Sequence, residues 1–261
     1  MRSDLRDSAL LLDREEALAA RAEADGCLLL RGVPGADAVA PVRTLVHAAC
    51  VALGLLDAEA PKRAAPRACA DAKLAGTGYD DPRWLALQQR VLADPRFVRL
   101  GDEPRLLRVL EVLLGEEPRG RRGDICRIAL PRAAHLTTPP HQDHWYTGGT
   151  TRMWTAWIAL TDTPLELGPL AVLPGSHTRG LLPHRGTGKG RQRVSVRAQA
   201  FAATPLAAGD AILFHSLTVH RALPNVTANR VRLSVDYRYQ AASEPLHSVR
   251  RDGTRAWGET S

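Results

Sequence analysis

The chain has 261 residues, of which 44% are hydrophobic and 24% are charged, and this length and composition are those of an ordinary globular protein. Its net charge is +7, but the arginines are spread along the whole chain and form no single basic stripe, which argues against a nucleic-acid partner. No apolar run reaches the roughly 18 residues of a membrane span, and acidic residues interrupt the N-terminal stretch, so we expect no membrane span, no signal peptide and a cytoplasmic location.

Residues 1–122 are predicted to form helical support with short strands. The expected elements are a short apolar strand within 25–33, amphipathic helices over 36–55, from Trp84 to Pro95 and from Asp102 to Gly115, and an irregular connection over 61–83.

From about residue 123 the pattern changes to short strands separated by turns, which is typical of an all-β sandwich or barrel. The expected strands cover 125–130, 153–160, 211–220 and 230–240. We therefore predict a single domain over 1–261, with a barrel core over 123–240 and a C-terminal tail over 241–261.

One stretch of this second half, residues 184–193, is dense in basic side chains. It contains three glycines and no aromatic residue. Such a composition predicts a loop that attracts an anionic substrate by its charge.

The four cysteines show no CxxC spacing, which argues against both a zinc knuckle and a disulfide scaffold. We expect buried or half-buried free thiols at Cys27, Cys50, Cys69 and Cys126.

The last predicted strand alternates strictly between polar and apolar residues. The polar set, which shares one face, is Arg230, Arg232, Ser234, Asp236 and Arg238. In an ordinary apolar core each of these charges would need a partner. The alternation therefore predicts a barrel with a polar interior, whose outer face is covered by the N-terminal helices.

The segment His141-Gln-Asp143 carries the pattern of a metal site. Two donors at positions i and i+2 of an extended segment point to the same side and can bind one ion. Two imidazoles and one carboxylate leave three positions of an octahedral ion open, as in non-haem Fe(II) oxygenases. An isolated His-x-Asp is also common in surface turns. We predict that His220 is the third ligand, because His215, five positions earlier, would face the other way on a regular strand and so would have a packing role.

Several motifs between residues 138 and 240 occur in the order found in one known family. They are Pro-Pro-His-Gln-Asp143, Ala156-Trp-Ile-Ala-Leu160, Gly168-Pro-Leu-Ala-Val-Leu-Pro-Gly-Ser-His177, Gly209-Asp and Thr218-Val-His-Arg-Ala-Leu-Pro-Asn225. In these motifs the chain resembles the phytanoyl-CoA dioxygenase family. The resemblance implies a mainly β fold with flanking helices: a double-stranded β-helix, a jelly-roll-like, cupin-type barrel covered by N-terminal α-helices. It also implies that Fe(II) is held by His141, Asp143 and His220.

The resemblance further implies that 2-oxoglutarate is the co-substrate and that an arginine meets its distal carboxylate. The family's arginine lies eleven positions after the distal histidine, which is Val231 here, so both Arg230 and Arg232 stay open. We favour Arg232, because Arg232-Leu-Ser234 resembles the arginine-x-serine pair of related oxygenases. Trp157 matches a tryptophan that lines the family's co-substrate pocket, with an ordinary core position as the alternative.

The implied reaction uses Fe(II), O2 and 2-oxoglutarate, with ascorbate as a reductant, and releases succinate and carbon dioxide. The expected outcome is hydroxylation of an unactivated C–H bond in a small-molecule metabolite or natural-product intermediate. Asp143 argues against a halogenase, because halogenases replace this carboxylate with a small residue. The alternatives are desaturation, epimerisation or ring formation by the same machinery, or a barrel that binds a metal or small ligand without catalysis.

Overall fold

The computed structural model describes residues 4–59, 62–75, 80–120, 123–186, 193–197 and 201–246. Parts of three segments lie outside the described residues: the connection over 61–83, the basic stretch over 184–193 and the tail over 241–261.

The strands of the described residues form two sheets in which every pairing is antiparallel. The larger sheet has the order β1-β6-β4-β8-β2, with β3 also paired to β8. Its strands are β1 (Cys27–Leu30), β2 (Pro118–Gly120), β3 (Ile125–Ala129), β4 (Met153–Ala159), β6 (Ala211–His215) and β8 (Arg232–Ala241). The smaller sheet pairs β5 (Leu170–Val172) with β7 (His220–Ala222). Because β8 pairs with three strands, it is the central element of the larger sheet.

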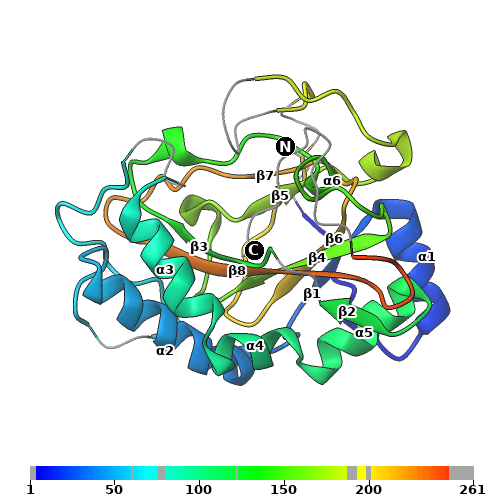
Figure 1. Ribbon diagram of the computed structural model, residues 1–261, viewed down its shortest axis with the longest axis horizontal. Helices are drawn as coiled ribbons and strands as arrows, with labels where there is room; N and C mark the ends of the chain where they lie inside the picture. Colours follow the sequence, from blue (N-terminus) through cyan, green and yellow to red (C-terminus); the bar gives the residue numbers. More distant parts are fainter. Residues whose placement is uncertain are drawn as a thin grey trace.

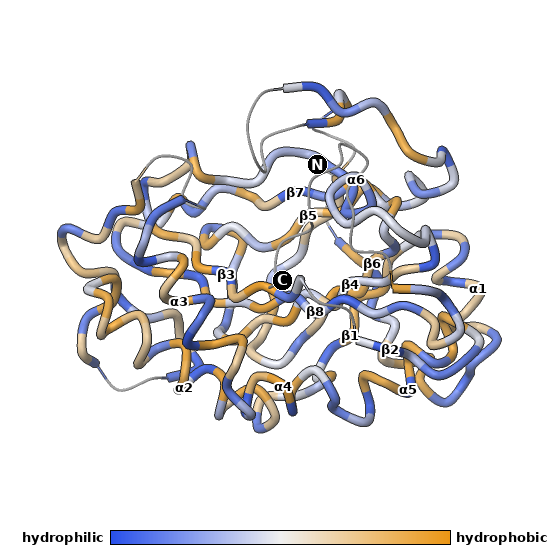
Figure 2. The backbone as a smooth tube through the Cα atoms, in the orientation of Figure 1, coloured by the Kyte–Doolittle hydropathy of each residue, from blue (hydrophilic) through white to orange (hydrophobic). Residues whose placement is uncertain are grey.

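A layer of helices lies on one side of the larger sheet, and Figure 1 shows β5, β7 and the short helix α6 on the other side. The helices are α1 (Glu15–Asp25), α2 (Ala36–Ala52), α3 (Pro82–Leu92), α4 (Pro95–Gly101), α5 (Pro104–Leu114) and α6 (Asp143–Thr147), with 3-10 turns at Ala9–Leu11, Ala134–Leu136, Leu165–Leu167 and Ser176–Arg179. Along this layer hydrophobic and hydrophilic residues alternate, as expected for helices with one buried face (Figure 2). None of the helices that the structure describes is long and apolar enough to cross a membrane.

Three consecutive helices begin with the same local signal, an acidic residue followed by proline. The pairs are Asp81-Pro82, Asp94-Pro95 and Glu103-Pro104. In each pair the carboxylate accepts a hydrogen bond from a backbone N–H of the first turn, and proline takes the first position, where no intrahelical N–H is needed. Pro95 therefore starts α4 as well as ending the preceding helix, and the sequence pattern had predicted only the end.

The outer face of β8 joins the sheet to this helical layer. Its apolar residues, together with Val231 just before the strand, belong to one buried cluster with residues of α1 to α5; they are Leu233, Val235, Tyr237 and Tyr239. The two tyrosines also satisfy their hydroxyls there, because Tyr237 donates to the Phe97 carbonyl at 2.8 Å and Tyr239 to the Gly101 carbonyl at 2.6 Å. This is the packing that the alternation of the strand predicts.

The single strand expected over 211–220 was wrong. β6 ends at His215, a turn follows in which Thr218 N–H donates to the His215 carbonyl at 2.8 Å, and β7 begins at His220 in the other sheet. His215 and His220 therefore do not share one regular strand: His215 ends β6 in the larger sheet and His220 begins β7 in the smaller one.

Other boundaries also differ from the expected ones. β8 begins at Arg232, so Arg230 precedes the strand. The sequence pattern missed α1, because its Ala- and Glu-rich sequence buries only Leu18 and Ala22 and shows almost no helical apolar stripe.

Leu233 is fully buried between the sheet and the helices, so its truncation tests this packing. Leu233→Ala should lower the free energy of unfolding by roughly 2–5 kcal/mol, the usual range for a buried leucine. The control Leu85→Ala, on α3 and 36% exposed, should change it by no more than about 0.5 kcal/mol. Denaturant titration of both variants measures the difference, and equal losses would contradict the assigned packing.

Candidate active site

Three side chains with metal-binding atoms converge at one end of the smaller sheet. His141 and His220 pair through their backbones, each N–H donating to the other's carbonyl at 2.9 Å. Gln142 is extended and Asp143 opens α6, so the side chains of His141 and Asp143 point toward the same place. One donor atom from each of His141, Asp143 and His220 lies within 4.8 Å of the others, and all three residues are buried.

Hydrogen bonds to backbone carbonyls fix the tautomer of both imidazoles. His141 Nδ1 lies 2.8 Å from the Pro139 carbonyl and His220 Nδ1 lies 3.0 Å from the Thr218 carbonyl. A carbonyl can only accept, so each Nδ1 carries the hydrogen and each Nε2 keeps its lone pair. Burial, assisted by His220, lowers the pKa of His141 to about 4, which keeps this imidazole neutral. Neutral imidazole with an oriented Nε2 is the form that binds a metal ion.

The Asp143 carboxylate has one oxygen held by the protein and one directed at the histidines. Oδ2 accepts from Thr155 Oγ1 at 2.8 Å and from Arg238 Nε at 3.2 Å. Oδ1 lies 3.6 Å from His141 Nε2 and 3.5 Å from His220 Nε2. Burial alone raises the pKa of this carboxyl, but the Arg238 guanidinium holds it well below its usual value. Asp143 is therefore ionised, and the donor set fits a divalent metal ion.

Arg238 is the main residue of this site to which the sequence assigned no role. Alternation along the last strand places it on the polar face, but its partner Asp143 is 95 residues away. The sequence carried one signal of this pair, the charge of Arg238 itself, because a buried carboxylate requires a cation nearby.

His215 lies outside the donor cluster. Its ring contacts Trp154 and His177, each at 5.6 Å between ring centroids, and its Nδ1 accepts from the Leu217 N–H at 3.2 Å. The structure thus gives His215 a packing environment.

The residues predicted to bind the co-substrate lie together on the inner face of the larger sheet. Arg232 is 3% exposed, its guanidinium lies 5.5 Å from the ring centre of Trp157, and it donates to the Gly168 carbonyl. Ser234 Oγ is buried and makes no hydrogen bond to any described residue. Arg230 lies elsewhere: its guanidinium donates to the Ala65 carbonyl at 3.0 Å.

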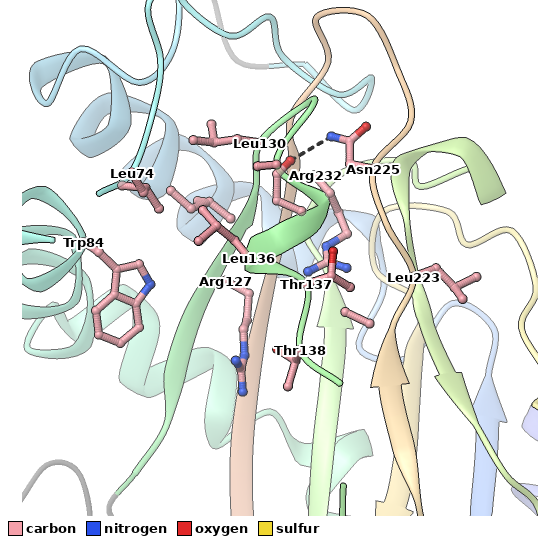
Figure 3. A pocket seen from close by; sticks show the side chains of 14 residues that line it. Leu74, Trp84, Arg127, Leu130, Leu136, Thr137, Thr138, Leu223, Asn225 and Arg232 are labelled. Atoms are coloured by element: carbon pink, nitrogen blue, oxygen red, sulfur yellow. Dashed lines mark hydrogen bonds between the residues drawn. The ribbon is translucent and has the colours of Figure 1, made fainter. Parts of the chain in front are cut away.

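A cavity opens beside these residues between β3, β8 and the segment that precedes His141 (Figure 3). Its polar lining includes Arg127, Arg232, Thr137 and Thr138, and its remaining wall is mainly apolar. Arg127 donates to Asp236 at 2.8 Å, so this interior arginine is charge-balanced. The cavity has the mixed lining of a small-ligand site, with a few polar groups in a mainly apolar wall.

The donor set of two imidazoles and one carboxylate is that of the non-haem iron oxygenases, and the family that the chain matches makes it a 2-oxoglutarate-dependent one. The chain belongs to the phytanoyl-CoA dioxygenase (PhyH) family, whose model matches residues 22–233. It is 31% identical over 258 residues to the 1-deoxypentalenic acid 11-beta-hydroxylase of Streptomyces exfoliatus, covering 92% of this chain and 86% of that protein. The protein of the same name from Streptomyces arenae is also 31% identical, over 257 residues.

Solved structures agree with this membership. The epimerase SnoN, in complex with Fe3+, alpha-ketoglutarate and nogalamycin RO, superposes with a TM-score of 0.64 at 27% identity, covering 93% of this chain and 88% of its own. The alpha-ketoglutarate-dependent carbocyclase SnoK superposes with a TM-score of 0.62 over 94% of both chains, but at 22% identity it supports the fold alone.

The pKa of His215 provides a test of its packing role. Burial, with smaller effects of His177 and His144, lowers this pKa from 6.5 to about 4. As the pH falls, the unfolded chain therefore binds a proton at His215 at a higher pH than the folded chain does. The stability that neutral His215 contributes is present above pH 6.5 and is lost as the pH falls toward 4.

His215→Asn should therefore make the free energy of unfolding less dependent on pH in this window, while Fe(II) binding is retained. His220→Asn should lose Fe(II) binding. Urea titrations across the pH range and anaerobic Fe(II) titration measure the two effects. Loss of the metal in His215→Asn with retention in His220→Asn would reverse the assignment.

Proposed function

We propose that this protein hydroxylates an unactivated C–H bond of a small natural-product intermediate, with iron held by His141, Asp143 and His220. The observation that carries the proposal is the convergence of two imidazoles, each oriented by a backbone carbonyl, and one ionised carboxylate oxygen at a single buried point. Bound there, Fe(II) would supply the reactivity toward O2 that couples substrate oxidation to conversion of 2-oxoglutarate into succinate and carbon dioxide. The remaining work of the protein is to orient both organic molecules and to exclude water.

We assign the two antiparallel sheets to a double-stranded β-helix formed by one domain over 1–261. The polar inner face of β8 and the apolar outer face under the helices support this assignment, since a barrel with a site inside needs both.

Arg232 is assigned to the distal carboxylate of 2-oxoglutarate. Its planar guanidinium can meet a carboxylate with two hydrogen bonds, and Arg232 lines the adjacent cavity. Ser234, with its hydroxyl buried and unbonded among the described residues, would donate to the same carboxylate. The Trp157 ring, 5.5 Å from the guanidinium carbon, would stabilise the guanidinium by a cation–π contact.

Hydroxylation is favoured over other oxidative outcomes by the full-length hydroxylase relatives. The second candidate is epimerisation, which the similarity to the epimerase SnoN favours. Product mass separates the two, because hydroxylation adds one oxygen atom and epimerisation adds none. Ring formation or desaturation would instead remove two hydrogen atoms.

Comparison of the two arginines tests the co-substrate site. Arg232→Ala should lower the affinity for 2-oxoglutarate by one and a half to more than three orders of magnitude, because truncating one partner of a buried charge pair costs roughly 2–5 kcal/mol. Arg230→Ala, which removes a half-buried arginine bonded to Ala65, should cost much less. The readout is the charge-transfer absorption of the anaerobic Fe(II) protein as 2-oxoglutarate is added. A large loss in Arg230→Ala alone would move the carboxylate site to the other arginine.

A turnover assay tests the function itself. With Fe(II), ascorbate, O2 and 2-oxoglutarate, the wild-type protein should release succinate slowly, and faster when a true substrate is added. A panel of terpenoid acids that includes 1-deoxypentalenic acid is the first choice, given the hydroxylase relatives. Asp143→Asn, which keeps the shape of the side chain, should lose both rates. No 2-oxoglutarate-dependent charge-transfer band in the wild type would favour the non-catalytic barrel.

A further inference from the structure

The residue between the two metal-binding side chains of the His-x-Asp segment is itself fully buried. Gln142 is 0% exposed and extended, with φ −119° and ψ 133°. Its side chain therefore points away from His141 and Asp143, toward the protein behind the metal site.

The Gln142 amide is fully hydrogen-bonded to backbone groups of two distant segments. Nε2 donates to the Gly180 carbonyl at 2.9 Å and to the Leu217 carbonyl at 2.7 Å. Oε1 accepts from the Leu182 N–H at 2.8 Å. One side chain thus connects the metal-binding segment to the 180–182 segment and to the turn between β6 and β7.

That turn controls the third histidine. Leu217 directly precedes Thr218, whose carbonyl holds His220 Nδ1 at 3.0 Å. The metal-binding segment makes a second hydrogen bond to the same turn, in which His144 N–H donates to the Ser216 carbonyl at 3.0 Å. A shift of the turn would rotate the His220 imidazole.

The 180–184 segment also grips the backbone of Gln142. Gln142 N–H donates to His184 Nε2 at 3.1 Å, and His184 Nδ1 lies 2.9 Å from the Leu182 carbonyl. The His184 ring stacks on Trp145 of α6, with 4.6 Å between centroids and 11° between planes. The segment that contains Gln142 is therefore held through its side chain, its backbone and the following helix.

We propose that Gln142 is a positioning residue of the metal centre, which fixes His141, Asp143 and His220 relative to one another. The proposal rests on the proposed assignment of these three residues as iron ligands. A neutral amide suits the position, because it donates twice and accepts once without adding charge beside the buried carboxylate. Glutamate would lose both donors, and an apolar side chain would remove the Gln142 partner of three partly buried backbone groups.

The test replaces Gln142 by the unbranched, apolar methionine. Gln142→Met should weaken Fe(II) binding about 10–100-fold, the usual effect of removing a residue that orients metal ligands. The charge-transfer band of the Fe(II) protein with 2-oxoglutarate should shift or weaken. The readouts are anaerobic Fe(II) titration and this absorption.

Gln88→Met is the matched control. Gln88 is also a buried glutamine bonded to backbone, donating to the Cys126 carbonyl at 2.8 Å and accepting from the Cys126 N–H at 2.9 Å, but it lies on α3. Its replacement should lower stability while Fe(II) affinity and the absorption band stay as in the wild type.

Wild-type Fe(II) affinity and an unchanged band in Gln142→Met would overturn the proposal. If that variant does not fold, Gln142→Glu takes its place, since it keeps the side-chain length and the acceptor for Leu182, and the same loss is expected. Failure of the wild-type protein to bind Fe(II) would overturn the ligand assignment as well. Binding by the wild type with no loss in either variant overturns only the role of Gln142.

Discussion

The buried contact between Asp143 and Arg238 is the interaction on which the rest of the site depends. The Asp143 carboxylate is buried beside the two imidazoles, and a buried ionised group without a partner is strongly disfavoured. Arg238 compensates this charge at 3.2 Å and Thr155 completes the bonding of the same oxygen, so that the other oxygen is directed toward the histidines. Without this pair the carboxyl would be favoured in its protonated form, which is a poor metal ligand.

The architecture of the larger sheet follows from the need to bring these groups together. β8 pairs with β4 in a register that sets Arg238 opposite Thr155 and Asp236 opposite Trp157. On the inner face two charges of β8 have ion-pair partners, with Arg127 on Asp236 and Asp143 on Arg238. On the outer face the same strand is apolar and packs on the helices. One ten-residue strand therefore carries the proposed co-substrate site, the counter-ion of Asp143 and a large part of the core contact.

The sequence predicted the parts of this arrangement that depend on local pattern. The spacing of His141 and Asp143, the strict alternation of the last strand and the apolar stripe of α5 are all local, and each appears in the structure. The strand over 211–220 was mispredicted, because nothing in its composition marks the turn that separates β6 from β7. The role of Gln142 was missed for another reason: its bonds reach carbonyls 38 and 75 residues away, and pairings of that range leave no local signature.

A crystal structure from crystals grown anaerobically with Fe(II) would test most directly whether Asp143, paired with Arg238, binds the metal together with the two histidines. We predict one metal ion bound by His141 Nε2, His220 Nε2 and Asp143 Oδ1, with Asp143 Oδ2 still hydrogen-bonded to Thr155 and Arg238. A metal bound through both oxygens of Asp143 with Arg238 displaced, or bound by other residues, would contradict it.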